Sequence, residues 1–185
     1  MLRPLARIFA AIAALALPGP AALAQAPDKP EPGSMEAIKA ATTESRFITP
    51  WVSYVPDVPG IPSPTRHLGH IVGAPGELTS TTKIYAYYRA LAAATRRVRV
   101  EVIGTSEEGR EILLVAVGDE KSLDEAEAQR KAMKDLADPR ASSEQRAEEI
   151  MSTIKPTYLL HGGLHSSETG SPEMLMELVH RLAVS

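Results

Sequence analysis

The chain has 185 residues, 44% of them hydrophobic, which suits one globular domain with a sizeable core. Aromatic residues make up only 4% and the formal net charge is -3, so the basic surplus of a nucleic-acid surface is missing. The absence of cysteine excludes disulfides, cysteine nucleophiles and cysteine-ligated zinc sites. We therefore expect one domain, held by its core and any metal, without a nucleic-acid partner.

The first 24 residues have the layout of a secretory signal peptide. Arg3 and Arg7 make a basic start, an apolar run follows over 8–17, and 22–24 reads Ala-Leu-Ala, which a signal peptidase accepts. The run is well short of the roughly 20 residues that span a bilayer. We predict cleavage before Gln25 and an exported protein, periplasmic or secreted, with no stable membrane anchor.

Residues 25–64 are predicted to form a proline-rich tether and an N-terminal loop. The stretch 25–34 has three prolines and little to bury, which is typical of a flexible or extended tether. After a short helix over 35–45, five prolines in 47–64 are too many for an interior strand. We expect a surface loop there, pinned to the body by Trp51 and Tyr54.

Two histidines, His67 and His70, have a spacing that deserves comparison with a metal pair. They lie among glycines, and Glu77 is the nearby carboxylate. Because a zinc site needs three or four ligands, a structural or solvent-exposed role is the better interpretation.

A helix and a β-hairpin are predicted next. Helix-start residues at 79–82 precede an apolar pattern of helical spacing that ends at Thr95. Val98, Val100 and Val102 then alternate with charged residues, as in a half-buried strand. A loop over 104–109 and a second apolar run over 111–117 complete the hairpin.

Two charged helices and a third strand follow. Ser122 and Glu125 resemble a capping box for a helix through Leu136, and Ser142 or Ser143 caps another that ends near Ile154. A third strand is predicted over 157–161, because its continuous apolar run Tyr158-Leu159-Leu160 suits a strand covered on both faces. Strands interleaved with helices predict an α/β domain with a layered sheet.

The last predicted helix starts with Ser171 as its cap, has Pro172 in its first turn and places Glu173 at the positive end of the helix dipole. It has no stop signal before Ser185, so we expect the domain to be incomplete. Its predicted buried face consists of Leu175, Leu178, Val179 and Leu182.

Between that strand and this helix, a Gly162-Gly163 turn presents His165 and Glu168. An imidazole and a carboxylate three residues apart in a tight turn can bind one zinc ion, or can simply cap the helix. Of the other histidines, His161 is assigned to a supporting hydrogen bond, and His180 to pairing with solvent or a neighbour.

The run His165-Ser-Ser-Glu168, with its preceding strand and glycine turn, resembles the first zinc motif of the zinc carboxypeptidase (carboxypeptidase A-like) family. The upstream stretches 67–78 and 97–112 resemble that family in the same order, so the resemblance covers residues 65–185. It implies a mixed central sheet flanked by helices, here incomplete, as the N-terminal part of a metallocarboxypeptidase catalytic domain.

The resemblance also implies a zinc cofactor, with His165 and Glu168 as metal ligands, and a peptide or protein substrate. The third histidine ligand, the glutamate base and the carboxylate-binding arginine of the family are expected beyond Ser185, so no catalytic residue is assigned here. The 185-residue chain alone is expected to be inactive and poorly folded. Ser167 stands where many family members have arginine, which affects the subsite near the zinc.

Three functions stay open on this basis. The first is an exported zinc metallocarboxypeptidase that releases C-terminal residues by zinc-activated water. The second is a zinc amidase of the same fold that acts on cell-wall peptides or acyl-amino acids. The third is a non-catalytic exported binding module.

Overall fold

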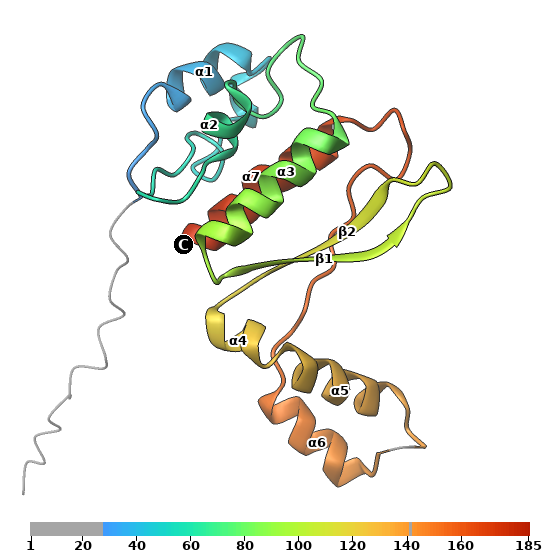
Figure 1. Cartoon of the computed structure of the whole chain (residues 1–185). Helices are drawn as coiled ribbons and strands as arrows, with labels where there is room; N and C mark the ends of the chain where they lie inside the picture. Colours follow the sequence, from blue (N-terminus) through green and yellow to red (C-terminus); the bar gives the residue numbers. More distant parts are fainter. Residues whose placement is uncertain (1–27, 141) are drawn as a thin grey trace, which may run out of the picture.

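The structure is a computed structural model that describes residues 28–140 and 142–185 (Figure 1). The predicted signal peptide over 1–24 and its cleavage before Gln25 lie outside the described residues. Among the helices that are described, none has the length and apolar character needed to cross a membrane.

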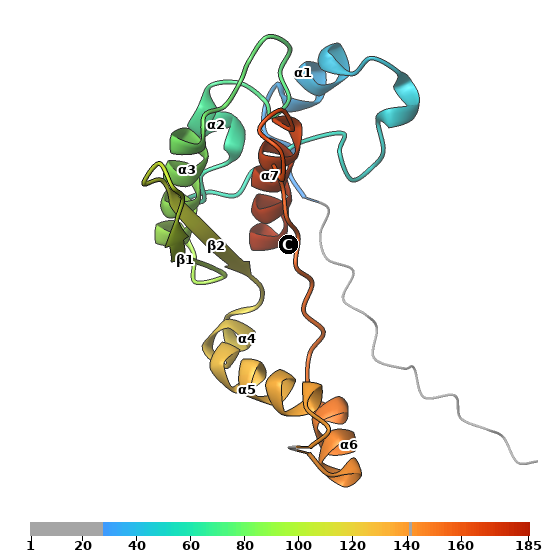
Figure 2. The same ribbon diagram turned by 90° about the vertical axis from the view of Figure 1, so that its right-hand side faces the viewer.

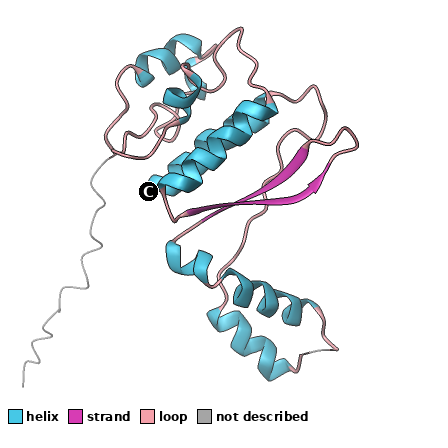
Figure 3. Cartoon of the chain, in the orientation of Figure 1, coloured by secondary structure: helices cyan, strands magenta, loops and turns pink. Residues whose placement is uncertain are grey.

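Helices make up most of the secondary structure in the described residues, with one β-hairpin between them (Figure 3). In chain order, the elements are α1 (Ser34–Ala41), η1 (Ser45–Phe47), α2 (Pro64–Leu68), α3 (Thr81–Ala94), β1 (Val98–Thr105), β2 (Glu111–Val117), α4 (Glu120–Asp124), α5 (Ala126–Ala137), α6 (Glu144–Thr153) and α7 (Gly170–Val184).

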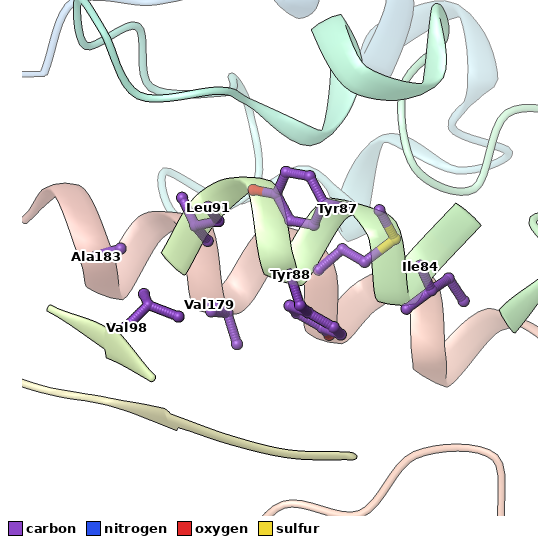
Figure 4. Packing of buried hydrophobic residues seen from close by; sticks show 8 residues of the cluster. Ile84, Tyr87, Tyr88, Leu91, Val98, Val179 and Ala183 are labelled. Carbon is purple, nitrogen blue, oxygen red and sulfur yellow. The ribbon is translucent and has the colours of Figure 1, made fainter. Parts of the chain in front are cut away.

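The core lies where α3, α7 and the hairpin meet (Figures 1 and 4). The helix predicted after residues 79–82 is confirmed as α3, whose N-cap Ser80 accepts a hydrogen bond from the Lys83 amide. The cluster of buried residues contains Ile84, Tyr87, Tyr88, Leu91, Val98, Met176, Val179 and Ala183. Burial of their apolar surface is the main contribution that holds α7 against α3 and the hairpin.

The hairpin is also confirmed: β1 and β2 pair antiparallel, with Val98 opposite Val117 and a register shift between Val102 and Gly104. The loop is shorter than the predicted 104–109, because β1 continues through Thr105. The third strand predicted over 157–161 is wrong. That segment is extended but unpaired, and its Tyr158 and Leu159 are 86% and 82% exposed. A strand needs a hydrogen-bonding neighbour, and the sheet in the described residues consists of β1 and β2 alone.

The fold is therefore a mixed α/β arrangement with a small two-stranded antiparallel sheet. The sequence predicted an incomplete mixed central sheet, and among the described residues only this antiparallel pair of strands is found.

The helices after the hairpin start and end differently from the prediction. Asp119, not Ser122, is the N-cap of α4, because its carboxylate accepts the Ser122 amide at 3.0 Å. A break at Glu125 then separates α4 from α5. Ser143 caps α6 as predicted, and its hydroxyl accepts the Arg146 amide.

The segment 28–34 is fixed to the body of the protein, contrary to the tether expected there. The Glu31 amide donates to Val55 O and the Asp57 amide to Lys29 O, each at 2.7 Å. Tyr54 pins the loop as predicted, since it donates to Asp28 and lies under the Arg181 guanidinium. Trp51 does not, because it is 80% exposed.

Helix α7 buries a different face from the predicted one. Its buried residues are Glu173, Met176, Val179, His180 and Ala183, so only Val179 was expected. His180 is completely buried, and its Nε2 donates to Pro56 O at 2.9 Å, so it pairs with a neighbour and not with solvent. Burial lowers the pKa of His180, which keeps the ring neutral.

Candidate metal centre

Two glycines shape the turn that leads into α7. Gly163 has a φ of +73°, which an L side chain rarely adopts, and its amide donates to the Ser171 hydroxyl at 2.9 Å. A Cβ on Gly162 would lie 2.7 Å from Leu175 Cδ1 and 3.2 Å from the Ser171 backbone. The turn therefore packs tightly on the start of the helix.

Ser171 does not cap that helix as predicted. The N-cap is Thr169, and α7 begins at Gly170. The Ser171 hydroxyl instead accepts the Gly163 amide and donates weakly to Glu168 O at 3.4 Å. It thus ties the turn together from inside the first helical turn.

His165 and Glu168 are brought together by the turn. The Glu168 amide donates to His165 O at 3.0 Å, and this hydrogen bond closes a backbone turn over residues 165–168. The His165 Nδ1 lies 2.5 Å from Glu168 Oε1, and the His165 amide donates to Glu168 Oε2 at 3.3 Å. Both side chains are open to solvent, with 70% and 47% of their surface exposed.

The carboxylate of this pair is charged at neutral pH. The side-chain hydrogen bond from His165, followed by the bond from the His165 amide, holds the pKa of Glu168 below its usual range. The turn therefore presents a negative charge beside an imidazole nitrogen, which favours a cation.

The donor types fit zinc, which takes imidazole nitrogen and carboxylate oxygen at about 2.0–2.2 Å. Two such atoms on a tetrahedral ion lie ~3.4 Å apart, so the pair at 2.5 Å would have to open by less than about 1 Å. A catalytic zinc takes three protein ligands, and the described residues contain no group of three candidate ligands. The turn therefore offers two of the three protein ligands that such a site would need.

The remaining histidines do not join this pair. His161 is exposed in the extended segment. His67 packs its ring against Tyr87 at 5.4 Å, and His70 Nδ1 donates to Ile71 O at 2.9 Å. These contacts give His67 and His70 structural partners.

Glu173, predicted only to face the helix dipole, makes its main contacts with a loop far away in the sequence. Its side chain is 4% exposed and accepts the Gly73 amide at 2.7 Å and the Thr79 amide at 3.0 Å. Burial raises the pKa of Glu173, but the hydrogen bonds from Gly73 and Thr79 outweigh it, so the net shift is downward. The carboxylate clamps the loop 73–79 to the first turn of α7, directly after the candidate site.

These features define a candidate metal-binding protein of mixed α/β structure, with an imidazole and a carboxylate in a glycine turn. The family model for zinc carboxypeptidase matches residues 84–185, which is more than half of the chain and runs from within α3 through α7. The chain belongs to this family, a family of zinc-dependent peptidases. Searches of the curated proteins and of the solved structures found no match.

Proposed function

We propose that His165 and Glu168 are two ligands of the catalytic zinc of an exported metallocarboxypeptidase, which releases C-terminal residues from peptides. The observation that carries the proposal is the direct contact of His165 Nδ1 with Glu168 Oε1 within the family match. The third histidine ligand, the glutamate base and the carboxylate-binding arginine would come from later parts of the family's domain.

The two side chains have distinct tasks in this proposal. Bound zinc would polarise the scissile carbonyl and acidify a water molecule. Glu168 supplies a charged carboxylate, and its contact with His165 keeps the two side chains together before the metal binds. His165 must present an unprotonated nitrogen, so zinc affinity should fall as the solution becomes acidic.

Zinc titration of the complete enzyme, in which the third ligand is expected, tests these two ligands. We expect His165→Ala and Glu168→Ala each to lose most of the bound zinc, because removing a ligand leaves the ion weakly held. His161→Ala is the matched control, an exposed histidine four residues away. Zinc binding at wild-type affinity in both ligand variants would contradict the assignment.

Ser167 supports a second candidate within the family, a zinc amidase for cell-wall peptides or acyl-amino acids. The arginine common at this position in the resembling family would contact substrate, so its replacement by serine changes the subsite beside the metal. Hydrolysis of muropeptides in preference to linear peptides by the complete enzyme would favour the amidase.

Export is part of the proposal and is tested separately. Mass spectrometry of the secreted protein should find Gln25, or a residue beside it, at the N-terminus. An intact Met1 would argue against the signal peptide.

A further inference from the structure

An open apolar groove is lined by residues of α1, of the loop after it and of α7. Figure 2 shows α1 and this loop on the side of α7 that faces away from α3. Its volume is about 540 Å³, within the usual range of ligand sites. We call it the α7 groove, and its apolar lining includes Phe47, Trp51, Val52, Ile71, Met174 and Leu178.

The α7 groove exposes large apolar side chains. Trp51 is 80% exposed, Phe47 53% and Met174 52%. These residues come from two distant parts of the sequence, the loop after α1 and the first half of α7, and they line one cavity. A gathering of this kind marks a binding surface more often than a scatter of single exposed residues does.

The charges in the α7 groove cancel each other. Its charged lining residues are Glu177 and Arg181, which pair at 2.8 Å. Arg181 also donates to Tyr54 O, so its guanidinium is already occupied. The groove therefore suits an uncharged, apolar ligand and offers no free counter-ion to an anionic one.

The position of the α7 groove connects it with the candidate metal centre. Along α7, its lining residues run from Gly170, two residues after Glu168, to Arg181. At 1.5 Å per helical residue Gly170 and Arg181 are ~16 Å apart along the helix axis. An extended chain advances about 3.3 Å per residue, so the groove has the length of roughly five peptide residues.

We propose that the α7 groove binds about five apolar residues of an extended peptide substrate, upstream of the bond that lies at the His165–Glu168 turn. This inference rests on the proposed function and specifies its substrate class: long peptides with apolar residues before the cleaved end. A surface built from Trp51, Phe47 and Met174 supplies contact area without charge recognition.

Trp51 provides a direct test, because it is the single tryptophan of the chain. The probe is an acetylated peptide of alternating leucine and alanine with a free carboxyl end, added to the purified protein without metal. We expect a saturable blue shift of tryptophan emission, since binding removes Trp51 from water. Met174→Lys should weaken binding at least tenfold.

The control variant is Met151→Lys, at a methionine of α6 that is 59% exposed and does not line the groove. It should bind the peptide like the wild type, and a peptide with serine in place of leucine should not bind. The proposal would be overturned if the leucine peptide gave no emission shift, or if the serine peptide gave an equal shift. Equal loss of peptide binding in both lysine variants would also overturn it. So would a shift only with phosphatidylcholine vesicles or only on self-association.

The zinc proposal and the groove proposal fail separately. His165→Ala should lose zinc and keep the fluorescence response to the peptide. Zinc retained in that variant refutes the metal assignment, whereas a missing response in the wild type refutes the groove.

Discussion

Removing the Glu173 carboxylate should destabilise the protein far more than removing an ordinary charge from a helix start. The side chain is 4% exposed and accepts the backbone amides of Gly73 and Thr79. Glu173→Ala leaves both amides without their acceptor, and an unsatisfied buried donor costs about 1–3 kcal/mol. We expect a loss of about 2–4 kcal/mol, a large share of the ~5–15 kcal/mol that stabilises a typical domain.

Glu173→Gln should lie between the wild type and Glu173→Ala. Its amide oxygen can accept one of the two backbone N–H groups, but its NH₂ group faces the other and the charge is lost. The pKa of Glu173 is lowered in the folded protein, so its stabilising effect is complete above the unfolded pKa of about 4.3 and is lost as the pH falls through the folded pKa. Glu173→Gln should flatten this acid limb.

Urea unfolding of the purified protein measures these differences, with Glu36→Ala as the matched control. Glu36 is also an acidic residue in the first turn of a helix, but it is exposed. Glu36→Ala should lose only the contribution of the helix dipole to the free energy of unfolding, about 0.3–1 kcal/mol. Equal stability of Glu36→Ala and Glu173→Ala, or a Gln variant less stable than the Ala variant, would refute the clamp.

Two further predictions concern the turn and α7. Gly162→Ala should lose about 1–3 kcal/mol of stability in thermal unfolding by overpacking, because the new Cβ would lie 2.7 Å from Leu175. Gly170→Ala is the control and should be neutral or slightly stabilising, because a Cβ there meets nothing within 4 Å. Equal effects of the two substitutions would contradict the packing argument. The lowered pKa of buried His180 means that its contribution is complete above the unfolded pKa of about 6.5 and is lost as the pH falls. His180→Gln should therefore reduce the drop in melting temperature between neutral pH and about pH 5, and an undiminished drop would rule out His180 as its source.

The sequence predicted the elements that depend on local chemistry. Helix α3 has its N-cap Ser80, and the hairpin has its alternating valines; both were found where expected. The capping of α4 was wrong by three residues, because Asp119 and Ser122 are both good caps and only the structure shows which accepts a hydrogen bond.

For the candidate site, the sequence predicted the contact between residues that are close together in one turn. His165 and Glu168 are three residues apart, and the glycines beside them already limit the backbone. The Glu173 contacts were missed because the partners Gly73 and Thr79 are 100 and 94 residues away. No local pattern distinguishes a carboxylate that binds such a loop from one that only faces a helix dipole.

The prediction of a third strand over 157–161 was wrong for the same reason, since it depended on contacts distant in the sequence. The apolar run of this segment is consistent with a buried strand, but a strand also requires a neighbour that satisfies its backbone groups. In the described residues the segment is solvent-exposed, and the hairpin leaves Val102, Ile103 and Ile112 exposed as well. Apolar composition therefore indicates that a segment tends to be buried, whereas the partner that buries it is set by contacts distant in the sequence. The same limit applies to the α7 groove, because its lining residues Trp51 and Met174 are far apart in the sequence and only the fold brings them together.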